Sequence, residues 1–98
     1  MNMTGIIMIN YIEWFTEQTY TGIKALLIHH SEITDSYKEW LDLKTRQITG
    51  IEASGNIAQK VEIDPVEFSN YCYRKALDCD IAALHHFTFL KGSGHEPS

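Results

Sequence analysis

Histidine and cysteine are the residues of this chain whose chemistry goes beyond packing and solvation. The histidines include two adjacent pairs, His29-His30 and His85-His86, and Cys72 and Cys79 lie between these pairs in the sequence. Thiolate sulfur and neutral imidazole nitrogen are ligands that zinc prefers. The two cysteines and the second histidine pair therefore define one hypothesis, a small metal site.

The spacing within this set argues against a metal. Zinc motifs usually place two ligands two to four residues apart, whereas Cys72 and Cys79 are seven residues apart. Neighbouring residues on a helix or strand point in different directions, so at most one histidine of each pair easily reaches a common point. The simpler interpretation is that Cys72 is a small core residue and that one histidine of each pair packs while the other is solvated. We therefore expect no metal and no cofactor.

Catalytic and bridged cysteines are also disfavoured. Cys79 stands between Asp78 and Asp80, and negative carboxylates beside a thiol oppose formation of the nucleophilic thiolate. If both cysteines share a helix, seven residues separate them by about 10 Å, which exceeds the Cα separation of about 7 Å that a disulfide tolerates. We expect two free thiols, which suit a reducing cytoplasm.

No motif in the chain fixes a reaction or a nucleic-acid partner. The six glycines are scattered, with no phosphate loop, dinucleotide fingerprint or nucleophile elbow. The region 65–90 has the order helix, turn, helix, but residues 81–90 contain no Arg, Lys, Asn or Gln with which to read base edges. Thirteen acidic and eight basic residues give a net charge of −5, which disfavours nucleic acids and anionic membranes. We expect a protein that is not an enzyme.

The size and composition indicate one small globular domain. Ninety-eight residues allow one domain with a modest core, and 44% apolar residues are too many for a disordered chain. The apolar run Ile6–Ile9 has no preceding Lys or Arg and is too short to span a membrane. We expect a soluble cytoplasmic protein in which residues 1–91 form one compact domain and residues 92–98 a flexible tail.

Hydrophobic periodicity predicts an α+β fold of about four helices with a small two- or three-stranded sheet and a C-terminal helical hairpin. Apolar residues at helical spacing predict a helix over residues 8–19, which Gly22 follows as a breaker. Residues 23–30 are apolar on both faces except at Lys24, which predicts a central strand.

The middle of the chain predicts a second helix over residues 34–47, with Thr34 or Ser31 as its N-cap and Gly50 as its stop. The turn signal at residues 54–56 predicts a hairpin over residues 51–63. An irregular loop followed by a single strand is the alternative.

The strongest local signal starts the third helix. Asp64 is a preferred N-cap residue, Pro65 suits the first helical position, and Glu67 would complete a capping box. This helix is predicted to run to residue 77. Asp78 or Asp80 is then expected to cap a last helix over residues 81–90, with Gly92 as its stop.

The faces of the last two helices indicate an association surface. Apolar side chains take two sides of the third helix and every side of the last one. A domain of this size has no room to surround two such helices, so an apolar patch should stay exposed and mark an association site. The alternative is that the sheet and the first helix cover both faces.

These observations favour a small acidic cytoplasmic protein that binds another protein, as a regulator, inhibitor, immunity protein or adaptor does. A symmetric homodimer is the simplest way to cover the patch, because two-fold dimers are the commonest oligomers. Aromatic residues often anchor such interfaces. The expected partner-binding residues are Tyr73, Phe87, Phe89, Leu90 and Trp40. The alternative function is a small metal-binding or catalytic domain that uses the Cys/His residues.

Overall fold

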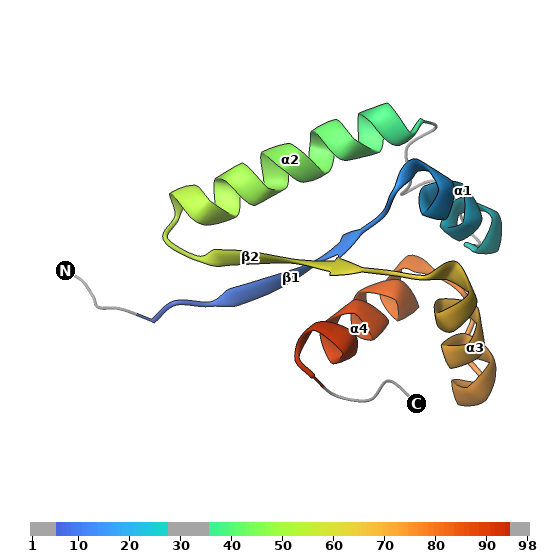
Figure 1. Ribbon diagram of the computed structural model, residues 1–98. Coiled ribbons are helices and arrows are strands. Elements are labelled where there is room, and N and C mark those ends of the chain that lie inside the picture. Colours follow the sequence, from blue (N-terminus) through green and yellow to red (C-terminus); the bar gives the residue numbers. More distant parts are fainter. Residues whose placement is uncertain (1–5, 28–35, 95–98) are drawn as a thin grey trace.

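The computed structural model describes residues 6–27 and 36–94 (Figure 1). Within these ranges the chain forms four helices and two strands, which confirms the predicted α+β class with its C-terminal pair of helices. The elements in chain order are β1 (Ile9–Trp14), α1 (Glu17–Leu26), α2 (Tyr37–Ala53), β2 (Ile57–Glu62), α3 (Pro65–Lys75) and α4 (Ile81–Gly92). None of the described helices is both long enough and apolar enough to cross a membrane.

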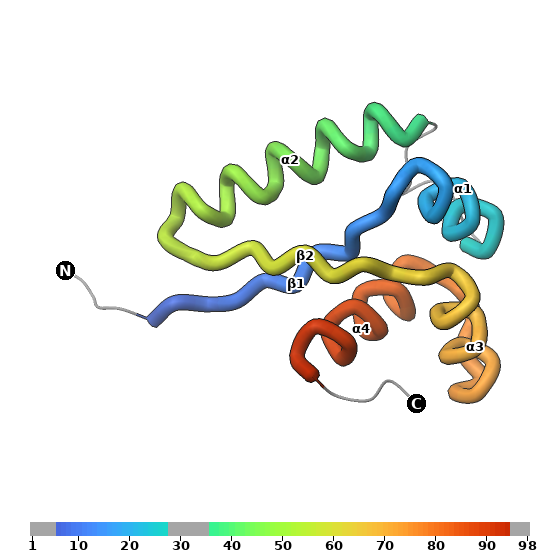
Figure 2. The backbone as a smooth tube through the Cα atoms, in the orientation of Figure 1, coloured from blue at the N-terminus to red at the C-terminus, as the bar shows by residue number. Residues whose placement is uncertain are grey.

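The two strands run parallel and side by side, paired from Ile9 with Ile57 to Trp14 with Glu62 (Figure 2). Parallel strands need a crossover connection, which the chain supplies through α1 and α2. Helices α2 and α4 lie on opposite sides of the strands, as Figure 1 shows. The strands are therefore sandwiched between helices, which is the usual setting of parallel pairing.

The predicted helix over residues 8–19 is wrong, because β1 occupies its first half. Ile12 and Glu13 are neighbours and are both buried. A strand that is covered on both faces has no clean alternation of apolar and polar residues. The spacing of its apolar residues therefore also fits a helix. The helix α1 begins only after Thr16, whose side chain accepts from the Thr19 amide while the Thr19 hydroxyl accepts from the Thr16 amide.

The predicted strand over residues 23–30 is also wrong, since its first part belongs to α1 and residues 28–35 lie outside the described ranges. Tyr20, Ile23 and Leu27 are buried at helical spacing. Gly22 lies inside the helix instead of ending it. A Cβ at this position would come within 2.9 Å of Pro65 Cγ, so the glycine allows α1 to pack closely on α3.

The second predicted helix exists, but its ends are shifted. Ser36 caps α2 by accepting from the Glu39 amide, and the predicted caps Thr34 and Ser31 lie outside the described ranges. The helix continues through Gly50 to Ala53. The predicted hairpin is therefore wrong, and the alternative single strand is present as β2.

The turn signal before β2 is confirmed. Gly55 has a φ of 87°, a conformation that favours glycine. Next to it, the Asn56 side chain accepts from the Met8 amide at 3.1 Å, which ties the turn to the start of β1.

The predicted starts of the last two helices are confirmed. Asp64 accepts from the Val66 amide at 3.1 Å with Pro65 following it, and Asp80 accepts from the Ala83 amide at 2.8 Å. Glu67 pairs with Lys91 at 2.8 Å instead of serving in a capping box. Helix α3 ends at Lys75, two residues earlier than expected, because the next residue turns into the left-handed region.

The core gathers side chains from every helix and from the ends of the strands. One part is an aromatic cluster around Trp40, whose ring lies 5.1–5.5 Å from four other aromatic rings. The other part lies between α3 and α4, where Phe87 packs against Phe68 and Tyr71. Most of the apolar surface of α4 is thus buried on its own chain.

Gly92 and Gly50 give a matched pair of predictions. Gly92 is the last residue of α4, where the tail was expected to begin. A Cβ on Gly92 would overlap the ring of Tyr11 and would lie 2.8 Å from Val61 Cγ2, whereas a Cβ on Gly50 would meet nothing within 4 Å. We expect Gly92→Ala to destabilise the fold by about 2 kcal/mol through overpacking. We expect Gly50→Ala to stabilise it by about 0.8 kcal/mol through helix propensity.

Urea denaturation of the two variants beside the parent chain measures both effects. Gly92→Ala should lower the urea midpoint, and Gly50→Ala should raise it. Equal shifts of one sign would show that α4 does not pack on the strands as described.

Candidate functional site

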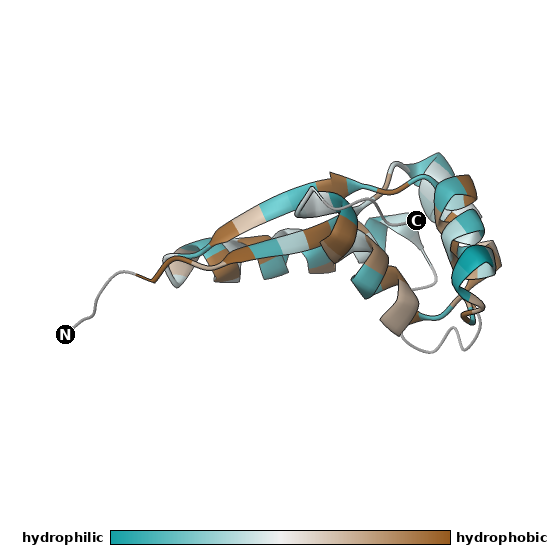
Figure 3. Cartoon of the chain, turned by 90° about the horizontal axis from the view of Figure 1, so that it is seen from below, coloured by the Kyte–Doolittle hydropathy of each residue, from teal (hydrophilic) through white to brown (hydrophobic). Residues whose placement is uncertain are grey.

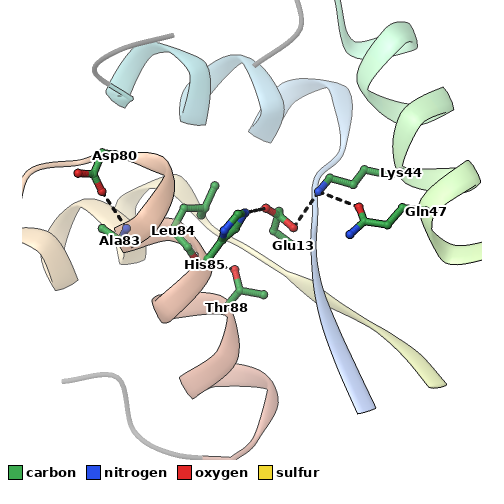
Figure 4. Close-up of polar contacts among 8 residues, drawn as sticks. All are labelled: Glu13, Lys44, Gln47, Asp80, Ala83, Leu84, His85 and Thr88. Carbon is green, nitrogen blue, oxygen red and sulfur yellow. Dashed lines mark hydrogen bonds and ion pairs between the residues drawn. The ribbon is translucent and has the colours of Figure 1, made fainter. Parts of the chain in front are cut away.

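Glu13 lies at the centre of a polar cluster between the two helical layers (Figure 4). Its side chain projects from β1 and its residue is 5% exposed. Lys44 of α2 approaches its Oε1 at 3.0 Å, and Nε2 of His85 on α4 approaches its Oε2 at 3.1 Å. The carboxylate therefore joins three elements that are far apart in the sequence.

The two partners keep this buried carboxylate ionised. Burial alone raises the pKa of Glu13, but the hydrogen bond from His85 and the charge and hydrogen bond of Lys44 outweigh it, so the pKa lies below its ordinary value of 4.5. A carboxylate can only accept. The Nε2 atom of His85 must therefore carry the hydrogen in this contact.

A small cavity opens beside this cluster. Its volume is about 210 Å³. The polar part of its lining is Glu13, Lys44 and His85, and the apolar part is Phe15, Trp40, Ile81 and Leu84. Convergent polar groups on an otherwise apolar wall are the usual composition of a small-molecule site.

The five predicted partner-binding residues do not form one patch. Trp40 and Phe87 are core residues, 5% and 2% exposed, and cannot contact a partner in this conformation. Leu90 is half-buried against the core. Phe89 is 52% exposed with its ring 5.8 Å from that of Tyr11, and Tyr73 on α3 is 89% exposed. Burial of α4 beneath the strands removes most of the surface that the sequence pattern indicated.

The two histidines of the hypothetical metal site contact different partners, and the two cysteines contact each other. His85 contacts Glu13, whereas Nδ1 of His86 lies 3.4 Å from the Tyr71 hydroxyl. Cys72 is buried in α3. Across residues 6–27 and 36–94, no three His, Cys, Asp or Glu side chains are grouped closely enough to hold a metal ion.

The two cysteines are free. The case in which both share a helix does not apply, because Cys72 lies in α3 and Cys79 follows it. The chain turns back after α3, and Cys79 approaches Cys72. Burial first, and then the neighbouring Cys79 thiol and Asp80, raise the pKa of Cys72 to about 12. A thiol with so high a pKa is almost wholly protonated at neutral pH and is a poor nucleophile.

We therefore expect one accessible thiol in the folded protein. Iodoacetamide should alkylate the partly exposed Cys79 at least about tenfold faster than Cys72, because only the thiolate reacts. Peptide mapping by mass spectrometry measures both rates, and unfolding in urea should make them equal. Equal rates in the native protein would contradict the burial of Cys72.

The apolar run Ile6–Ile9 is visible in the sequence, but its exposure as the stretch that leads into β1 was missed there. Ile6, Ile7, Met8 and Ile9 are all more than half exposed, and the paired Ile57 is 46% exposed. Figure 3 shows this hydrophobic stretch extending away from the helices. The run from Ile6 to Ile12 contains no charged residue, and that signal could have been read from the sequence.

The outward-facing backbone of β1 differs from that of β2. The Met8 carbonyl accepts from β2, and the Trp14 carbonyl accepts from the residue after β2. In parallel pairing, successive residues turn their backbone groups alternately toward the neighbouring strand and away from it. The N–H and C=O groups of Ile9, Tyr11 and Glu13 thus point away from β2, and among the described residues no backbone hydrogen bond joins them to another element. We call this the β1 edge. Because Glu13 is 5% exposed, the part of this edge that a further strand can reach lies at Ile9 and Tyr11.

The corresponding edge of β2 is protected. Its outward-facing residues are Ala58, Lys60 and Glu62, and the Glu62 carbonyl accepts from the Lys91 ammonium at 3.0 Å. Charged side chains on an edge strand oppose pairing with another chain. The β1 edge is therefore the better template for a further strand.

Compared with known proteins, the chain matches no family model, no curated protein and no solved structure.

Proposed function

We propose that this chain acts by binding another protein, without catalysis, and that the partner adds a β-strand to the β1 edge. The observation that carries the proposal is the uncharged, exposed run from Ile6 to Ile9, which leads into a strand whose outer backbone groups form no backbone hydrogen bond to another element among the described residues. Strand addition satisfies such groups and buries the apolar side chains beside them. The two free thiols suit a cytoplasmic site of action.

A second copy of the chain is the partner that this edge suits best. Two β1 edges related by a two-fold axis pair antiparallel, so each supplies the same residues to the other. Because the run from Ile6 to Ile12 is uncharged, such pairing brings no like charges together, although each chain carries a net charge of −5. Uncharged, β-branched segments without proline are the ones that self-pair readily.

Sedimentation velocity over a range of concentrations tests this proposal. We expect a dimer that dissociates on dilution, and Ile9→Lys should give a monomer because a charge on the edge opposes pairing. Val66→Lys is the matched control, since Val66 is equally apolar and 65% exposed but lies on α3. It should leave the dimer intact.

A monomer at every concentration would contradict self-pairing. A synthetic peptide copying residues 6–14 then tests the edge itself by hydrogen exchange of the Ile9 and Tyr11 amides. Unchanged exchange in saturating peptide would reject strand addition at β1. If Val66→Lys disrupts the dimer and Ile9→Lys does not, the interface lies on α3.

A further inference from the structure

We infer that the cavity beside Glu13 binds a compact monocarboxylate with an apolar body, with its carboxylate placed at Lys44. The inference uses side chains of the layer between β1, α2 and α4, whereas the proposed strand addition uses the outer backbone of β1. The two can therefore fail separately.

The size and walls of the cavity determine the body of the ligand. A volume of about 210 Å³ is small beside the roughly 300–1,000 Å³ of sites that hold drug-sized ligands, so it suits one aromatic ring or a short branched chain. Trp40, Phe15 and Leu84 are buried residues on this wall. Contact between such a wall and apolar ligand atoms is favourable, and the wall offers few hydrogen-bond partners to water.

The donors at the polar end determine the head group. The ammonium of Lys44 donates to Glu13 Oε1 at 3.0 Å and to Gln47 Oε1 at 3.3 Å. An ammonium has three donors, so one remains for a ligand, and the Lys44 side chain is only 16% exposed. This end of the cavity therefore favours a ligand that offers an acceptor, and a charged acceptor makes the stronger hydrogen bond.

The charges favour a carboxylate over a cation. Glu13 and Lys44 carry opposite charges that compensate each other at 3.0 Å, so an entering anion meets no net negative charge. Each oxygen of Glu13 already accepts from Lys44 or His85. A cationic ligand would have to compete with these donors and would lie against the Lys44 ammonium. A neutral ligand of the same shape would still accept from the ammonium, but without a negative charge of its own its bond would be weaker.

Three probes that share one ring distinguish these cases: benzoate, benzyl alcohol and benzylammonium. Titrations followed by amide chemical shifts should give a dissociation constant of about 1 mM or tighter for benzoate. The other two probes should bind at least tenfold more weakly. Shifts should concentrate at the cavity residues, and the fluorescence of Trp40 should change with benzoate.

Variants separate the head-group contact from the cavity itself. Lys44→Met keeps most of the side-chain volume but removes the donor, and it should abolish the preference for benzoate. Arg46→Met is the matched control on the same helix, since the Arg46 side chain is 75% exposed and pairs with Asp42. It should bind benzoate like the parent chain.

Ile81→Phe keeps the charged cluster and fills the cavity, so binding should be lost even if Lys44→Met fails to fold. Benzoate binding that survives Ile81→Phe would overturn the site. Equal affinities for the three probes, or no binding by any, would overturn the carboxylate assignment. None of these outcomes depends on the oligomeric state of Ile9→Lys in sedimentation velocity, which tests the proposed strand addition.

Discussion

Trp40→Ala is expected to destabilise the fold by about 4 kcal/mol, in the range found when a large buried aromatic residue is truncated. Trp40 is 5% exposed. Its ring lies against those of four other aromatic residues: Trp14 from β1, Phe15 from the link between β1 and α1, Tyr20 from α1, and Tyr37 from its own helix. Truncation therefore leaves a cavity where the strand and both crossover helices meet. For a domain of this length, whose total stability is about 5–15 kcal/mol, the loss is a large share.

Urea denaturation of Trp40→Ala, Trp40→Phe and Tyr73→Ala measures this effect. Trp40→Phe retains an aromatic ring and should cost about half as much. Tyr73→Ala removes an aromatic side chain of similar size that is 89% exposed, and it should change the stability by less than about 0.5 kcal/mol. If the Trp40 and Tyr73 truncations had similar effects, Trp40 would not be in the core.

Glu13→Ala is expected to cost about 3 kcal/mol. The substitution leaves the Lys44 ammonium, with a side chain 16% exposed, without the carboxylate that compensates its charge. Removing one member of a buried ion pair costs this much because the other charge stays desolvated. Asp42→Ala breaks the exposed pair with Arg46 on the same helix and should change the stability by less than about 0.5 kcal/mol.

A double variant separates a lost interaction from a stranded charge. Glu13→Leu with Lys44→Met removes both charges and replaces them with apolar groups. It should be more stable than Glu13→Leu alone, because apolar replacement of a whole buried pair is often neutral or favourable. A double variant no more stable than the single one would show that Lys44 finds water when its partner is lost.

The pH dependence follows from the direction of the Glu13 shift. Its pKa in the folded protein lies below the ordinary value of 4.5, so the unfolded chain takes up a proton at higher pH than the folded one. The stability contributed by Glu13 is therefore present above about pH 5 and is lost as the pH falls through the folded pKa. Glu13→Gln cannot titrate here, and its urea midpoint should fall less steeply with acid. Parallel curves would contradict the lowered pKa.

The local sequence predicted the C-terminal half of the fold well. Asp64 with Pro65 and Asp80 mark helix starts through bonds to amides two or three residues away. Gly55 marks a turn through its own backbone freedom. These signals act over a few residues, so no knowledge of the fold was needed to interpret them correctly.

The N-terminal half could not be predicted in the same way. The pattern from Ile9 to Phe15 suits a helix or a strand covered on both faces, and only pairing with a segment 48 residues further along makes it a strand. Thr16 and Thr19 form a reciprocal cap, but threonine replaces the Glu or Gln that usually completes the capping-box signature, so the sequence signal for this helix start is weak. Here the tertiary partner decided the secondary structure.

The candidate sites show the same division. The sequence by itself determined that the chain is acidic and that residues 6–12 are uncharged, because composition and local pattern need no fold. Only the tertiary structure decided that Trp40 and Phe87 are core residues and that Glu13, Lys44 and His85 meet. Their meeting depends on how β1, α2 and α4 pack across the sheet, and spacing along the chain does not encode that packing.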